Sequence, residues 1–228
     1  MNWMLLTVLL ASSPAEPPVT PVLTTEAVCQ IGPSLQTGTL IFSQGDCLAI
    51  RVYTQSPYTH VAAVVIRHGE PMVYDTTGGP GVRCQTFEKY LASQGTADLF
   101  LLQPKEKFPE GRCLEFEKYL DSQLGRPYSV QHHLTGNRVA GLHCAEYLTD
   151  TLMHCKMIKA KAPAKVSPAS LRTGLLQAKL YDHSTTFRLT TAELPVVAEK
   201  SWCSQSWDCT TGCTSFCWRK MRGWFCCQ

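Results

Sequence analysis

A short run of β-branched and apolar residues, THVAAVVI at 59–66, places the strongest constraint on how this chain folds. Such runs are typical of β-strands. The sequence HGEP at 68–71 is a turn signal, and MVYD at 72–75 resumes the strand pattern. These segments predict an antiparallel hairpin, and the similar pattern from residue 37 onward predicts that the hairpin belongs to a small antiparallel sheet.

After the predicted sheet, apolar residues take the spacing of a helix. In the segment 110–124, apolar residues recur at close to the three- and four-residue spacing of an amphipathic helix. A chain that combines antiparallel strands with such helices belongs to the α+β class. We expect further helices over 87–93 and 144–154, further strands over 99–102 and 185–191, and a loop over 78–82.

Composition allows one substantial core and argues against nucleic acid as a partner. The chain has 228 residues, of which 44% are hydrophobic and 17% are charged, and this length is short for two domains of typical size. Its formal net charge is only +3, whereas neutralising phosphates requires a dense basic surface. We therefore expect one domain of catalytic size with appendages, and no binding to nucleic acid.

The first residues have the pattern of a secretory signal peptide. Residues 3–10 are apolar, too few to span a bilayer, and a cleavage point follows Ala15. No Lys or Arg precedes the apolar run, so an N-terminal helix or strand of the folded domain is the alternative. Four prolines, at positions 14, 17, 18 and 21, favour an extended linker. We predict a signal peptide over 1–15, a Pro-rich linker over 16–36 and a secreted or cell-envelope protein.

Twelve cysteines indicate an oxidising compartment, because such a density in a reducing cytosol would need metals or catalysis to explain it. Six of them lie between 203 and 227, within a linker and Cys/Trp-rich tail over 182–228 that has no Cys-x-x-Cys pair. We expect a disulfide-stapled appendage, whose pairing the sequence leaves open. The alternative is a peripheral membrane contact through the Trp and basic residues of the tail.

Cys144 is the candidate nucleophile. It lies in GLHCAEYLTD, where a Gly-containing loop enters a predicted helix. A helix N-terminus presents unpaired N–H groups and partial positive charge, which stabilise a thiolate and an oxyanion. The backbone N–H of Ala145 belongs to this expected oxyanion site. The structural alternative is a core or disulfide-bonded cysteine, so the assignment requires a base nearby.

His60 is the candidate base, because it interrupts the otherwise apolar strand 59–66 with an ionisable ring. The hairpin brings Asp75 to the adjacent strand, where its carboxylate is suited to orient the imidazole. The structural alternatives are a satisfied core histidine for His60 and a turn-capping carboxylate for Asp75.

Six short motifs carry a family resemblance: GTLIF at 38–42, YTHV at 58–61, VYD at 73–75, GRPY at 125–128, HCAEY at 143–147 and VSPASL at 166–171. In this order they resemble the YiiX-like family, which belongs to the permuted branch of the NlpC-type papain-like hydrolases. The resemblance covers about 37–171. It implies a circularly permuted papain-like fold, with a small antiparallel sheet packed on helices, over a catalytic domain at 37–181.

The resemblance also implies roles for individual residues. In the family, the histidine comes first on a strand, an acidic residue follows on the next strand, and the cysteine opens a helix. It therefore implies that Cys144 is the nucleophile, His60 the general base and acid, and Asp75 the orienting group, where relatives usually have Glu. The tyrosine of the G-x-P-Y motif falls on Tyr128, and its implied role is to support the substrate or oxyanion.

Neighbouring polar residues have structural interpretations. Glu146 matches a family glutamate and suits the first turn of a helix, where a carboxylate interacts favourably with the helix dipole. His143 is adjacent to the nucleophile, so its ring is expected to point elsewhere on the helix. His132 and His133 with Cys155 lack the spacing of zinc ligands, so we expect neither a metal nor another cofactor.

Three classes of function follow from these observations. The leading prediction is a secreted cysteine hydrolase that cleaves an amide or related acyl bond through a thioester acyl-enzyme. Its expected substrate is a peptide, a cell-wall peptide or a lipidated amide. The alternatives are a lipid acyltransferase or thioesterase at a membrane surface, and a non-catalytic binding module with Cys144 in a disulfide.

Overall fold

The computed structural model describes residues 20–44, 56–131, 133 and 140–190. Within these residues, seven strands form one sheet in the order β1-β7-β6-β2-β3-β4-β5. Neighbouring strands from β7 to β5 are antiparallel, and β1 adds to β7 as a parallel edge strand. The strands are β1 (Thr20–Leu23), β2 (Leu40–Ser43), β3 (His60–Arg67), β4 (Glu70–Thr77), β5 (Gly81–Thr86), β6 (Asp98–Pro104) and β7 (Tyr181–Thr190).

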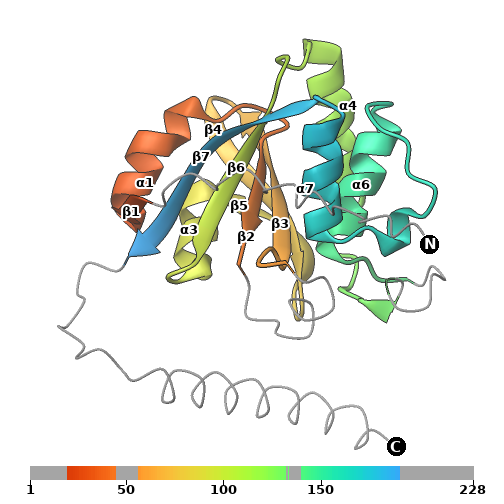
Figure 1. Ribbon diagram of the computed structural model, residues 1–228, viewed down its shortest axis with the longest axis horizontal. Coiled ribbons are helices and arrows are strands. Elements are labelled where there is room, and N and C mark those ends of the chain that lie inside the picture. Colours follow the sequence, from red (N-terminus) through yellow and green to blue (C-terminus); the bar gives the residue numbers. More distant parts are fainter. Residues whose placement is uncertain (1–19, 45–55, 132, 134–139, 191–228) are drawn as a thin grey trace, which may run out of the picture.

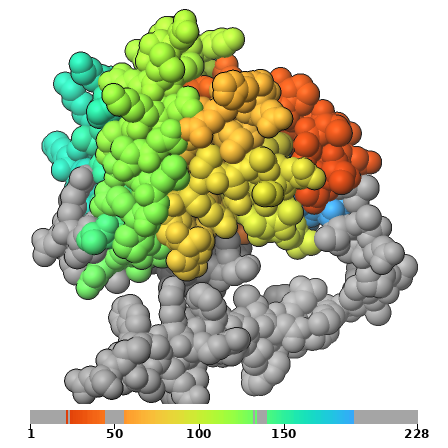
Figure 2. All heavy atoms as spheres, turned by 180° about the vertical axis from the view of Figure 1, so that it is seen from behind, coloured from red at the N-terminus to blue at the C-terminus, as the bar shows by residue number. Residues whose placement is uncertain are grey.

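Helices cover both sides of the sheet, with α1 and α3 on one side and α4, α6 and α7 on the other (Figure 1). Seen from behind, the red surface of α1 and the green surface that includes α4 lie apart, with orange and yellow segments between them (Figure 2). The helices are α1 (Thr24–Ile31), α3 (Phe87–Gln94), α4 (Glu110–Ser122), α6 (Cys144–His154) and α7 (Pro168–Gln177), with short 3₁₀ helices η1 (Gly32–Ser34) and η2 (Pro163–Lys165).

Successive apolar side chains along the central strands point to opposite faces of the sheet, so the core has two layers. On β3, Val61, Ala63 and Val65 pack with the layer of α4, α6 and α7, whereas Ala62 and Val64 pack with α1 and α3. All five side chains are at most 1% exposed. Because successive side chains of a strand point to opposite faces, a sheet covered on both faces needs apolar residues in both positions. The run 59–66 meets this requirement.

The structure confirms the prediction of an antiparallel sheet packed on helices. Strands β3 and β4 form the expected hairpin, with Ala63 opposite Tyr74. Helices α3, α4 and α6 and strand β6 lie where the sequence predicts them, and β7 begins earlier than expected. The segment expected as a loop contributes its last two residues to β5.

The described part of the segment 16–36 is not a linker. It contains β1 and α1, and Ala27 of α1 is fully buried against the sheet. Pro21 is compatible with this arrangement because β1 lies at the edge of the sheet, where a missing N–H donor is tolerated. Pro21 therefore does not exclude regular structure in this described part of the segment.

Helix α7 lies where the sequence analysis predicts no element. Its first turn has a capping box, in which the Ser167 hydroxyl accepts a hydrogen bond from the Ser170 N–H and the Ser170 hydroxyl accepts one from the Ser167 N–H. Pro168 occupies the first helical position, which suits its missing N–H and fixed φ. The Ser-Pro pair is thus a helix-start signal.

No helix within the described residues is long and apolar enough to cross a membrane. The cysteines among these residues, Cys29, Cys84, Cys113, Cys144 and Cys155, are free thiols. The predicted signal peptide, Cys47 and the tail from residue 191 onward lie outside the described residues, and the predicted tail disulfides stay predictions.

Gly81 should be more sensitive to substitution than Gly79 in the same turn. Both have positive φ, but a Cβ at Gly81 would lie 2.2 Å from the Arg126 carbonyl oxygen, whereas a Cβ at Gly79 meets no atom within 4 Å. We expect Gly79→Ala to cost about 1 kcal/mol in free energy of unfolding, and Gly81→Ala about 1–3 kcal/mol more. Urea denaturation of both variants measures the difference, and equal losses would contradict the close approach.

Candidate active site

His60 and Asp75 meet on neighbouring strands of the sheet. His60 is the first residue of β3, opposite Ser43 of β2, and Asp75 lies on β4. The His60 Nε2 atom is 3.5 Å from Asp75 Oδ2, longer than a strong hydrogen bond, so the attraction is mainly electrostatic. Asp75 is 1% exposed. The structure therefore brings together the predicted base and the predicted orienting carboxylate.

Arg83 is a third member of this group that the sequence analysis misses. It lies directly opposite Asp75 on β5. Its Nε donates to Asp75 Oδ1 at 2.8 Å, and its terminal nitrogen donates to Oδ2 at 3.1 Å. Burial acts to raise the pKa of Asp75, but the interaction with His60 and the two hydrogen bonds from Arg83 lower it below its ordinary value. Asp75 is consequently a carboxylate held in one orientation.

Cys144 is the first residue of α6, and His143 caps this helix. The Glu146 N–H donates to the His143 Nδ1 atom at 3.3 Å, and the Tyr147 N–H donates to the His143 carbonyl at 3.0 Å. The N–H groups of Cys144 and Ala145 precede these two and have no acceptor within the helix. The thiol therefore lies at the positive end of α6, as predicted.

The pKa values of Cys144 and His60 move in opposite directions. Burial acts to raise the pKa of Cys144, but hydrogen bonds to His143 and His60, and the charges of both rings, lower it to about 6. Burial acts to lower the pKa of His60, but Asp75 and the Cys144 thiolate raise it to about 10. Both shifts favour the form of the pair in which Cys144 is a thiolate and His60 an imidazolium.

His143 is held by backbone groups on both sides of its ring. Its Nε2 donates to the Ala164 carbonyl at 3.0 Å, while Nδ1 accepts the Glu146 N–H. Burial acts to lower the pKa of His143, but the hydrogen bond to Cys144 and its charge raise it. The expectation that the His143 ring points away from the nucleophile is therefore wrong, because the ring caps the helix and interacts with the thiol. His60, which interacts with both the thiol and Asp75, is better placed as base.

The remaining predicted site residues surround the start of α6. Tyr128 forms an isolated parallel bridge with Leu142, which brings the predicted support residue close to the nucleophile in the fold. Ala145 is fully buried in the first turn of the helix. Glu146 is also fully buried, with its carboxylate 3.9 Å from His143 Nε2. It is His143, and not Glu146, whose side chain caps the helix.

Comparisons with known proteins concern the fold. No protein-family model matches the chain. No curated protein matches it. Among solved structures, the metalloprotein YiiX from Escherichia coli O157:H7 is similar, with a TM-score of 0.52 and 16% identity over 70% of this chain and 98% of that chain. The chain has a YiiX-like fold.

The name of that structural neighbour raises the question of a metal. Among the residues that the structure describes, no group of three or more His, Cys, Asp or Glu side chains is arranged to hold a metal ion. His133 packs edge-on against His143, with ring centroids 5.3 Å apart. Burial and the charge of Glu115 raise the pKa of Cys155 to about 11, so this thiol stays protonated. His132 lies outside the described residues.

Replacing Arg83 should destabilise the protein most at neutral pH. The folded-state pKa of Asp75 lies below its ordinary value, so its charge adds stability above about pH 4 that is lost as pH falls through the folded pKa. Arg83→Met raises that folded pKa and reduces the contribution. We expect a loss of about 2 kcal/mol in free energy of unfolding at pH 7, shrinking below about pH 4.

Arg188→Met is the matched control in these denaturation experiments. Arg188 also binds a carboxylate through two nitrogens, that of Asp98, but its side chain is 55% exposed, compared with 30% for Arg83. An exposed pair contributes about 0–1 kcal/mol. Equal losses in the two variants at every pH would show that Arg83 does not stabilise the Asp75 charge.

Proposed function

We propose that this protein is a cysteine hydrolase that cleaves an amide or related acyl bond through a thioester acyl-enzyme. The observation that carries the proposal is that Cys144 lies at the start of α6 beside His143 and His60, whose hydrogen bonds and charges lower the pKa of the thiol to about 6. A thiolate is the reactive form of cysteine, and a lowered pKa is what distinguishes reactive from structural cysteines. The free thiol at Cys144 is consistent with this role.

The proposed reaction has two balanced steps. The Cys144 sulfur attacks the carbonyl carbon of the substrate, and the resulting tetrahedral oxyanion collapses with cleavage of the C–N bond. The His60 imidazolium gives its proton to the departing amine. Water then attacks the thioester while His60 accepts a proton, and collapse releases a carboxylic acid and restores the thiolate and imidazolium.

Neighbouring groups have distinct parts in this scheme. The N–H groups of Cys144 and Ala145 lie at the positive end of α6 and are assigned to the oxyanion. Asp75 holds His60 and stabilises its protonated form, and Arg83 holds Asp75. Tyr128 is assigned to substrate or oxyanion support, because its bridge to Leu142 brings it beside the start of α6.

The finer assignments belong to the same proposal. The motif order, with His60 before Asp75 and Cys144, and the YiiX-like fold support a circularly permuted papain-like domain. The signal-peptide pattern supports a secreted or cell-envelope location, where peptides, cell-wall peptides and lipidated amides are the substrate classes we propose. Peripheral membrane contact through the tail is part of this hypothesis.

The Cys144 thiolate should be measurable without a substrate. The far-ultraviolet absorbance of thiolate, taken as the difference between the native chain and Cys144→Ser, should titrate with a midpoint at about 6. In His60→Ala, the midpoint should move up but stay below about 8.5, because the His60 imidazolium is lost while His143 still stabilises the thiolate. A native midpoint at the ordinary thiol value would contradict the proposed ion pair.

Alkylation of the full chain tests the same thiol by reactivity. At neutral pH and without reductant, mass spectrometry should find iodoacetamide on Cys144 before Cys155, which is an internal control because both side chains are 3% exposed. The rate at Cys144 should fall roughly tenfold or more in His60→Ala as the thiolate fraction falls. Equal labelling of the two cysteines would contradict a specific activation.

Catalysis is tested by labelling the nucleophile with a substrate-like electrophile and by measuring turnover. We expect a peptide-derived acyloxymethyl ketone to modify Cys144, and the adduct to disappear in Cys144→Ser and to form more slowly in His60→Ala. With peptide amide and N-acyl amide substrates, the free carboxylic acid should be released. Transfer of the acyl group to an added amine or alcohol in preference to water would identify an acyltransferase, and no adduct or turnover would contradict the enzyme proposal.

A further inference from the structure

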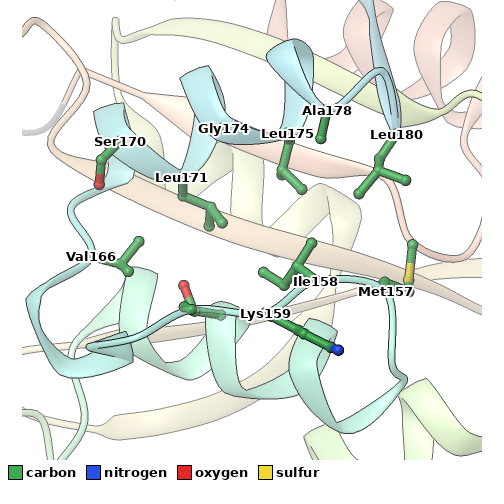
Figure 3. A pocket seen from close by; sticks show the side chains of 12 residues that line it. Met157, Ile158, Lys159, Val166, Ser170, Leu171, Gly174, Leu175, Ala178 and Leu180 are labelled. Carbon is green, nitrogen blue, oxygen red and sulfur yellow. The ribbon is translucent and has the colours of Figure 1, made fainter.

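A cavity of 390 Å³ lies between α7 and the segment that follows α6. Side chains of α7 and of the residues after it, including Leu171, Leu175 and Leu180, point toward Ile158 and Val166 on the opposite wall (Figure 3). Its volume falls within the roughly 300–1,000 Å³ typical of small-molecule pockets. We call this cavity the α7 groove.

The α7 groove is distinct from the thiol site but adjoins the same segment. Thr149 is the member of α6 that lines it, and Cys144 does not. The link between the two sites is η2, because the Ala164 carbonyl accepts the hydrogen bond from His143 while Val166 lines the groove. A ligand in the groove would therefore lie beside the active site without covering the nucleophile.

The segment that forms most of the α7 groove is rich in Lys and Arg. From residue 151 to residue 181 there is no Asp or Glu, whereas six basic residues occur, at 156, 159, 161, 165, 172 and 179. Lys159 belongs to the wall of the groove itself (Figure 3). Two carboxylates flank this segment, those of Asp150, which is buried, and Asp182, which is exposed. The combination is an apolar slot with a cationic edge.

We propose that the α7 groove binds one apolar chain of a free, single-chain amphiphile whose anionic head group pairs with Lys159. The apolar walls suit a hydrocarbon chain, which needs no hydrogen bonds. A peptide in the same place would leave its backbone N–H and C=O groups without hydrogen-bond partners. A concave slot encloses a single chain better than it meets the surface of a bilayer. This ligand site goes beyond the proposed hydrolysis and does not depend on it.

Isothermal titration of the full-length Cys144→Ser chain tests the site without catalysis. The probes are laurate and dodecyltrimethylammonium, which share a chain length and differ in head-group charge, both below their micelle concentrations. We expect saturable binding of laurate with one molecule per chain, and weaker binding of the cation. Equal affinity for the two probes, or no binding of laurate, would overturn the proposal.

Gly174→Trp places a bulky side chain at a residue that lines the groove, where an added Cβ meets no atom within 4 Å. We expect it to weaken laurate binding about tenfold or more, while Gly111→Trp on α4, equally open at Cβ, leaves it unchanged. Lys159→Glu should weaken binding about two- to fivefold, with the loop residue Lys107→Glu as control.

Two outcomes would contradict the site. Full laurate affinity in Gly174→Trp would show that the chain binds elsewhere. Cosedimentation with phosphatidylglycerol vesicles, combined with no affinity for monomeric laurate, would identify a membrane contact in place of a ligand site. If the native chain binds laurate but shows no turnover of any amide substrate, the result would count against the hydrolase proposal alone.

Discussion

The structure depends on how one buried carboxylate is paired. Asp75 is 1% exposed in a sheet covered on both faces, and an ionised group in such a place costs several kcal/mol unless partners offset it. His60 supplies one partner from β3 and Arg83 supplies another from β5. A slip of one residue between these strands would turn either partner to the opposite face. The contact that serves the proposed chemistry therefore also specifies the strand register.

The hairpin and the three residues of the proposed site could be predicted because their signals are local. The run 59–66 predicts a strand by composition, and an ionisable residue such as His60 is conspicuous within it. Cys144 follows a Gly-containing loop and precedes a helical pattern, so its place at a helix start is visible in the sequence. The turn at 68–71 then brings Asp75 to the neighbouring strand.

Other parts of the fold and site depend on tertiary contacts that local patterns do not contain. Pro21 suggests a linker in the sequence, and only the pairing of β1 with β7 shows that it belongs to a strand. Two missed features did have readable signals. Ser167 and Pro168 form a helix start, and Arg83 lies across the Gly-rich turn from Asp75, where opposite charges attract. The helix cap at His143 has no such sequence signal, because histidine is an uncommon residue at the N-cap position.

The first and last described strands are neighbours, since β1 pairs with the end of β7 from Phe187 to Thr190. The N-terminal edge of the sheet can therefore close only after almost the entire described chain has been synthesised. Contacts between such distant segments form slowly, because a long loop must be ordered first. We propose that this chain is exported. The late pairing of β1 would then keep the domain incompletely folded while its N-terminal end enters the translocation machinery.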